Sequence, residues 1–260
     1  MTAHTTYETQ GSLAILTFDR PEARNAMTWE MYEALVEACD RVDREAALRV
    51  LVLRGAGAKA FVAGTDIAQF QNFNDREDGL KYEERLDRVL DRLERVTKPT
   101  IAQVQGVAAG GGCAIAFTCD LRVATPDASF GIPVARTLGN CLSGATYGRL
   151  LDLMNPGTVK DLLFTGRLIA GDEAKALGLV NRLVAADLLD STVRALATEI
   201  AANAPLTLRA TKEMVRRVLA TRRLAAGDDA DIVEMCYTSR DFREGVTAFL
   251  AKRKPVWSGS

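Results

Sequence analysis

Two segments carry glycines where backbone N–H groups could meet a ligand. In the first, residues 59–67, a short apolar run ends at Gly64 and is followed by Thr65. In the second, Gly110–Gly112 precede an apolar run, 114–117, that we expect to be a buried helix. Glycine allows close backbone approach, and the first N–H groups of a helix have no acceptor within it. The two segments therefore predict donors for an anionic oxygen, although three glycines alone more often only form a turn.

The sequence has few histidine and cysteine side chains that could act as catalytic groups or metal ligands. The one histidine, His4, lies in a polar N-terminal stretch. This argues against a Ser-His-Asp or Cys-His hydrolase, a His-ligated zinc enzyme and a histidine proton shuttle. The five cysteines are scattered with no CxxC pair, which favours a reducing compartment over a disulfide or zinc framework. Carboxylates, hydroxyls, thiols, amides or backbone dipoles must carry any reaction.

Composition points to a small-molecule partner. The 260 residues are 48% hydrophobic and 26% charged, with 33 Lys and Arg against 34 Asp and Glu. This balance gives no electrostatic footprint for nucleic acid or an anionic membrane. No stretch approaches the roughly 18 apolar residues that a membrane helix needs, and no targeting signal is seen, so we expect a cytoplasmic protein.

The elements that must position the glycines form an α/β pattern. Strands are predicted at 13–18, 50–53, 101–104 and 121–124, with amphipathic helices at 29–44 and 83–96 between them. Helical crossovers predict parallel neighbouring strands. From about Thr146 onward helices dominate, at 159–164, 171–177, 185–203 and 206–224. The charge-rich stretch 75–84 is interpreted as a solvated loop and helix entry without a function.

The sequence resembles the crotonase, or enoyl-CoA hydratase/isomerase, superfamily almost from end to end. The motifs that carry the resemblance are Asp19–Ala26, Ala63–Ile67, Val104–Gly106, Gly110–Cys113, Cys119–Arg122, Phe130–Gly131, Gly166–Arg167, Ala174–Val180 and Phe249–Pro255. The resemblance implies a spiral of ββα units over residues 1–195 that binds acyl-CoA. It also implies a helical C-terminal region, 196–260, for oligomerisation and part of the CoA site, and a homotrimer or a dimer of trimers.

The resemblance also implies roles for particular residues. The N–H groups of Thr65 and Gly111 match the family's oxyanion hole, in which two fixed backbone donors stabilise a thioester enolate. The predicted CoA contacts are Ala23, Arg24, Lys59, Ala63, Asp66, Ile67 and Lys252. For the two lysines, a solvated surface amine is an equally good interpretation. No cofactor is expected beyond the CoA of the substrate.

The sequence departs from the hydratase pattern at both proton-transfer positions. The family's two glutamates correspond here to Ala114 and Val134, neither of which can move a proton. The loop 136–143 offers Arg136, Asn140, Cys141 and Ser143 instead. Cys141 stands where a dehalogenase branch of the family places a nucleophilic aspartate, so we take Asn140 and Cys141 as catalytic candidates. The alternative is that Cys141 is a small buried residue.

The sequence thus predicts an acyl-CoA enzyme of the enoyl-CoA hydratase/isomerase kind, whose oxyanion hole is intact and whose proton transfer is impaired or rebuilt. One alternative is a different thioester enzyme, a hydrolase, decarboxylase or isomerase with a rebuilt proton donor. The other is a non-catalytic acyl-CoA binding protein. The expected partner in every case is an acyl-CoA or enoyl-CoA thioester.

Overall fold

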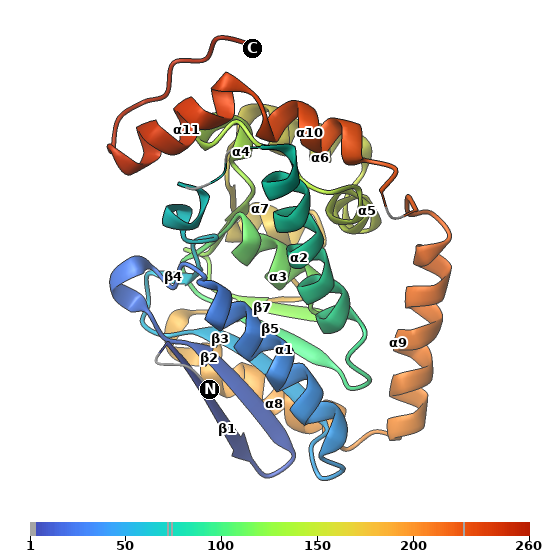
Figure 1. Ribbon diagram of the computed structural model, residues 1–260. Helices are drawn as coiled ribbons and strands as arrows, with labels where there is room; N and C mark the ends of the chain where they lie inside the picture. Colours follow the sequence, from blue (N-terminus) through green and yellow to red (C-terminus); the bar gives the residue numbers. More distant parts are fainter. Residues whose placement is uncertain (1–3, 72, 74, 226) are drawn as a thin grey trace.

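Two β-sheets organise the chain in this computed structural model, which describes residues 4–71, 73, 75–225 and 227–260 (Figure 1). The larger, six-stranded sheet has the order β1-β2-β3-β5-β7-β10, and the smaller has the order β4-β6-β8-β9. The strands of the larger sheet are β1 Thr5–Gln10, β2 Leu13–Phe18, β3 Val50–Gly55, β5 Thr100–Val104, β7 Leu121–Ala124 and β10 Arg182–Leu183. Those of the smaller are β4 Ala60–Val62, β6 Val107–Ala109, β8 Ser129–Gly131 and β9 Ile169–Ala170.

The four predicted strands are confirmed as the centre of the larger sheet. β2 pairs with β3, β3 with β5, and β5 with β7, all in parallel as expected. β1, which the sequence analysis missed, pairs with β2 in antiparallel register. All strands of the smaller sheet and β10 were also missed, because strands of two or three residues leave no periodic pattern to detect.

Both faces of the larger sheet are covered, so most positions of its central strands are buried. Along β2, Leu13 and Ile15 pack against one helix layer, whereas Ala14 and Leu16 face the main core on the opposite side. This alternation is the period of two expected for successive side chains of a strand. A strand buried on both faces is typical of a parallel sheet covered by helices.

Helices surround the sheets and provide most of the C-terminal part (Figure 1). Their bounds are α1 Trp29–Arg44, α2 Arg76–Glu94, α3 Gly111–Thr118, α4 Val134–Thr137, α5 Gly144–Leu153, α6 Pro156–Thr165, α7 Gly171–Ala176, α8 Leu189–Ala201, α9 Pro205–Ala220, α10 Ala230–Tyr237 and α11 Arg240–Leu250. Short 3₁₀ turns are η1 Pro21–Ala23, η2 Ile67–Phe70 and η3 Ala186–Leu188. In the described residues no helix is long and apolar enough to span a membrane.

The predicted end of the core at residue 195 lies within α8. Val193 and Ala197, on either side of that point, pack together on the larger sheet. The division into 1–195 and 196–260 therefore stays a prediction. Further along, α9 runs along one side of the body and is joined to it by the ion pair of Lys212 with Asp120 at 2.7 Å, whereas α10 and α11 return to the other end of the molecule (Figure 1).

Residues 75–84, interpreted as a solvated loop and helix entry, contain the helix entry but no loop. α2 begins at Arg76, seven residues earlier than the predicted helix, and Asp75 caps it by accepting a hydrogen bond from the Asp78 N–H at 3.1 Å. A capping aspartate satisfies an N–H that the first turn leaves without an acceptor. The early start carries Tyr82 and Glu83 into the protein interior, where both side chains are buried.

Candidate active site

Thr65 follows β4 in a turn that leaves its backbone N–H without a partner. Met27 forms a parallel bridge with Thr65, in which the Met27 N–H donates to the Gly64 carbonyl at 2.8 Å. The Met27 carbonyl accepts from the Asp66 N–H at 2.9 Å. In a parallel bridge of this kind, Met27 bonds to the residues before and after Thr65 and not to Thr65 itself. Among the described residues, no acceptor receives the Thr65 N–H.

Gly111 supplies the second donor because it begins a helix. The first intrahelical bond of α3 is donated by the Ala114 N–H to the Gly110 carbonyl at 3.0 Å, so the Gly111 N–H precedes the bonded turns. Gly110 has φ 52° and ψ −124°, a conformation that side-chain-bearing residues rarely adopt. The glycine sequence therefore produces the sharp strand-to-helix turn from β6 into α3.

The two donor segments lie directly against each other. A Cβ atom built on Gly111 would lie 3.3 Å from Thr65 Oγ1 and would overlap the hydroxyl of Tyr32. A Cβ on Gly110 would lie 3.6 Å from the Cα of Gly64. Gly64, with φ 115°, and Gly110, with φ 52°, adopt backbone conformations that favour glycine, and the Tyr32 hydroxyl leaves no room for a side chain at Gly111. The structure thus brings together Thr65 and Gly111, as the sequence predicts.

The donors open onto a cavity of about 480 Å³. Of the residues predicted to contact the ligand, it is lined by Ala23, Arg24, Ala63, Thr65, Asp66, Ile67, Gly111 and Asn140. Apolar residues of α2, α4 and the following loop form much of the remaining wall, including Leu86, Leu138 and Leu142. An apolar chain of modest length with a polar group near Thr65 and Gly111 fits such a cavity.

Ala114 on α3 and Val134 on α4, which the resemblance matches to the family's two glutamates, also line this cavity. Neither side chain ionises. The cavity wall is therefore apolar at these two positions.

Asp66 organises the loop that carries Thr65. Its Oδ2 pairs with Nη1 of Arg20 at 2.7 Å, while Oδ1 accepts from the N–H of Ala68 at 3.1 Å and so caps η2. Behind this pair, the buried Asn25 donates to the carbonyls of Ala60 and Phe61 at 2.8 and 3.3 Å. The Asp19–Ala26 motif therefore anchors the first donor loop through side-chain bonds to its backbone.

Three of the predicted site residues lie away from the cavity lining. Lys59 and Lys252 are exposed, and neither lines the cavity in the described part of the chain; their contact with CoA stays a prediction. Cys141 is buried, and its thiol lies 3.7 Å from the carbonyl of Ile232. Arg136, weighed as a carboxylate-binding group, is exposed on α4.

Sequence reasoning missed Glu83, a carboxylic acid in the cavity wall. Its side chain accepts hydrogen bonds from the Tyr237 hydroxyl at 2.5 Å and from the Ser143 N–H at 2.9 Å. Burial raises its pKa to about 8, because removing a carboxylate from water disfavours the charged form. The only sequence signal was its helical spacing, three residues before Leu86 and seven before Leu90.

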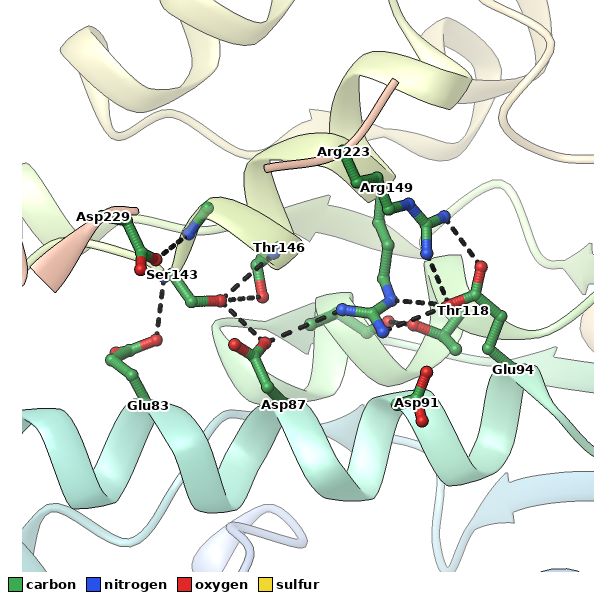
Figure 2. A network of polar contacts seen from close by, with 12 residues as sticks. Glu83, Asp87, Asp91, Glu94, Thr118, Ser143, Thr146, Arg149, Arg223 and Asp229 are labelled. Carbon is green, nitrogen blue, oxygen red and sulfur yellow. Dashed lines mark hydrogen bonds and ion pairs between the residues drawn. The ribbon is translucent and has the colours of Figure 1, made fainter. Parts of the chain in front are cut away.

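A row of acidic residues on α2 faces the start of α5 (Figure 2). Asp87 accepts from the Ser143 hydroxyl at 2.7 Å, and Glu94 pairs with Arg149 at 3.1 Å and with Arg223 at 2.7 Å. Burial raises the pKa of Glu94, but the interactions with Arg223 and Arg149 lower this pKa by more than burial raises it. The pKa of Glu94 is therefore below the usual value. These bonds fix α5 and the preceding loop against α2. In the described residues, no group of three His, Cys, Asp or Glu could hold a metal ion.

Comparison with known proteins identifies the class to which this fold and site belong. Residues 8–260 match the family model described as enoyl-CoA hydratase/isomerase, and the chain belongs to that family. It is 35% identical to a short-chain-enoyl-CoA hydratase of Clostridium acetobutylicum, over 95% of this chain and 94% of that one. It is 36% identical to a crotonyl-CoA hydratase of Syntrophomonas wolfei, over 95% of each.

Solved structures agree with the fold. A methylmalonyl-CoA decarboxylase complexed with 2S-carboxypropyl-CoA superposes with a TM-score of 0.91 at 27% identity, covering all of both chains. An enoyl-CoA hydratase/carnithine racemase from Magnetospirillum magneticum gives a TM-score of 0.81 at 31% identity, over 100% of this chain and 97% of that one. The predicted crotonase-like fold and the family are thus confirmed, and the chain is an enzyme of the enoyl-CoA hydratase/isomerase family.

Proposed function

We propose that this enzyme converts enoyl-CoA thioesters through an enolate held between the N–H groups of Thr65 and Gly111. The single observation that carries the proposal is the convergence of these two unpartnered donors on one cavity. When a proton leaves Cα, or a nucleophile adds to Cβ, negative charge develops on the thioester oxygen. Donors fixed in advance stabilise that charge, and removal of one typically costs roughly 2.7–4 kcal/mol of barrier.

The CoA part of the substrate is assigned to the rim formed by η1 and the β4 loop. Ala23, Ala63 and Ile67 give this rim an apolar lining, and Arg24 lies exposed beside them. A guanidinium pairs well with phosphate because its donors form a rigid fork. Lys59 and Lys252 are the further candidates for the nucleotide end. No cofactor beyond the CoA of the substrate is needed for this chemistry.

Decarboxylation is the second candidate, and a specific observation favours it. Because Ala114 and Val134 leave the wall apolar, no base stands at either of these positions. Loss of carbon dioxide from a carboxylated acyl group generates the same enolate without a base to remove a proton. The likeness to a methylmalonyl-CoA decarboxylase, with its TM-score of 0.91, supports this reading.

Mass spectrometry of thioesters incubated in deuterium oxide tests the proposal. A panel of 2-enoyl- and 3-enoyl-CoA should gain deuterium on carbon with CoA still attached, since enolate formation exposes Cα to solvent protons. Addition of one water identifies hydration, and unchanged heavy atoms identify a double-bond shift. Loss of carbon dioxide from methylmalonyl-CoA, with no change in the enoyl thioesters, supports the decarboxylase instead. Release of free CoA, or no change in any thioester, contradicts both.

A further inference from the structure

Two carboxylic acids, Asp66 and Glu83, are among the described residues that line the cavity, and Asp66 is already bonded to other protein groups. Both oxygens of Asp66 are engaged, with Arg20 and with the Ala68 N–H. Glu83 is the other. Its side chain is only 4% exposed, and in the described chain no lysine or arginine forms an ion pair with it. A buried acid without a counter-ion costs folding free energy, so such groups are concentrated at functional sites.

Two polar side chains connect Glu83 to a second point on the cavity wall. Tyr237 on α10 donates its hydroxyl to Glu83, and Asn140 donates Nδ2 to that hydroxyl at 3.0 Å. The other end of the Asn140 amide, Oδ1, is buried with no partner in the described structure. A buried acceptor without a donor is unfavourable unless a ligand or water supplies one. Glu83 and Asn140 therefore give the cavity wall two polar groups that the Tyr237 hydroxyl connects.

We propose that Glu83 is the catalytic residue that moves protons along the acyl chain, in place of the two glutamates absent at Ala114 and Val134. This inference rests on the proposed enolate chemistry. Tyr237 and Asn140 are then positioning residues, because the Tyr237 hydroxyl holds the carboxyl and the Asn140 amide holds that hydroxyl. The assignment places the proton-transfer group on α2 instead of at Ala114 on α3.

A double-bond shift is the reaction that one carboxyl can complete by itself. The Glu83 carboxylate takes a proton from Cα of a 3-enoyl thioester, and the C–H electron pair moves toward the carbonyl, placing negative charge on the oxygen bound by Thr65 and Gly111. The protonated carboxyl then returns the proton to Cγ as the electrons move back and the double bond forms between Cα and Cβ. Atoms and charge balance, and no water or oxidant is consumed.

The surroundings of Glu83 suit this exchange near neutral pH. Burial raises its pKa to about 8, the Tyr237 hydrogen bond lowers it, and the charges of Asp87 and Asp229 raise it. A pKa close to the working pH lets a group both accept and donate a proton. The ionisable groups that surround it come from every element packed against it: Tyr32 from α1, Tyr82 and Asp87 from α2, Cys141 from the loop before α5, Tyr147 and Arg149 from α5, and Asp229 and Tyr237 from before and within α10.

The experiment compares Glu83→Gln with Asp87→Asn. Asp87 lies one helical turn further along α2 and contacts the same residue, Ser143, but does not line the cavity. Deuterium incorporation from solvent into 3-enoyl-CoA is the readout, with binding of CoA as the control. We expect Glu83→Gln to lose roughly 10²-fold or more of the rate while binding CoA normally, and Asp87→Asn to remain active. Unchanged turnover in Glu83→Gln overturns the assignment and leaves the proposed function standing, whereas an inactive wild type overturns the proposed function.

A second variant separates proton transfer from a structural role. Tyr237→Phe removes a hydrogen bond that lowers the pKa of Glu83. Because the carboxylate form starts the reaction, the wild-type rate should rise with pH around a midpoint near 8, and the midpoint should move to higher pH in Tyr237→Phe. A rate that is independent of pH in the wild type, or an unmoved midpoint in the variant, contradicts the assignment even if Glu83→Gln fails to fold.

Discussion

The hydroxyl oxygen of Tyr32 lies 2.8 Å from Thr65 Oγ1, so the side chain of Thr65 points into the core although the residue also lines the cavity. Tyr82 completes the contact from α2, with its hydroxyl 2.9 Å from the same Oγ1. Burial raises the pKa of both tyrosines, and they stay neutral. A chain of buried hydroxyls therefore orients a backbone donor without taking part in the reaction.

Thr65→Val should lower both stability and turnover, because valine keeps the shape but leaves the tyrosine hydroxyls without their shared partner. A lost hydrogen bond with a buried group left unsatisfied costs about 1–3 kcal/mol. Urea unfolding and the rate of deuterium incorporation measure the two effects. Thr65→Ser keeps the hydroxyl and is the control; equal behaviour of the valine and serine variants would show that the hydroxyl contacts are unimportant.

Glu83 makes the stability of the protein depend on pH. Its folded-state pKa of about 8 lies above the ordinary value of 4.5, so the folded state binds the proton more tightly than the unfolded state does. The free energy of unfolding of the wild type, relative to Glu83→Gln, should therefore fall as pH rises from 4.5 to about 8, and stay constant beyond it. The limiting slope is about 1.36 kcal/mol per pH unit. Urea unfolding of both proteins across this range is the measurement, and parallel curves would refute the prediction.

Arg149→Ala should destabilise the protein strongly. The Arg149 side chain is 8% exposed and lies 3.1 Å from Glu94, so its removal takes a charge from a buried pair. Breaking such a pair lowers the free energy of unfolding by roughly 3–5 kcal/mol. We expect a smaller loss here, because Glu94 keeps its ion pair with Arg223. Arg88→Ala removes an exposed partner of Glu84 on the same helix and should cost no more than about 1 kcal/mol. Equal losses in chemical denaturation would contradict this view of the network.

Cys141→Ala tests the nucleophile that the sequence suggested. The Cys141 thiol is buried toward Ile232 and Cys236. The hydrogen bond with Cys236 and, to a smaller extent, burial raise the pKa of this thiol. The side chain is therefore not held as a thiolate. We expect unchanged turnover and a loss of about 1 kcal/mol in stability from the small cavity. Steady-state rates and urea unfolding check this result. Lost turnover with retained CoA binding would restore Cys141 as a catalytic residue.

The outer face of α9 should lie between subunits of the proposed trimer or dimer of trimers. Leu206, Met214 and Val218 recur at multiples of four residues, which places them on one face of the helix, and all three are exposed. Apolar surface of this kind often marks a contact with another protein. Light scattering should give the mass of three or six chains for the wild type and a smaller mass for the double variant Met214→Glu, Val218→Glu. A monomeric wild type would exclude the assembly.

The sequence by itself determined the parts of the site that depend on neighbouring residues. The strands 13–18 and 121–124 follow from short runs rich in Leu, Ile and Val, and the turn at Gly110 follows from a conformation that glycine favours. The two backbone donors were therefore predictable, since a donor needs only a local turn and a helix start. The apolar residues at Ala114 and Val134, which the resemblance matches to the family's glutamates, were visible for the same reason.

Only the tertiary structure decided where an acid enters the cavity. Glu83 lies in a charged stretch that local composition marks as solvated, yet its buried contact comes from Tyr237, 154 residues away. A sequence pattern reports the hydrophobic period of α2 but not which distant helix will cover its N-terminal half. The same limit applies to Cys141, whose burial depends on residues of α10. Burial of a polar side chain results from the packing of remote elements, and so it becomes visible only when the chain is folded.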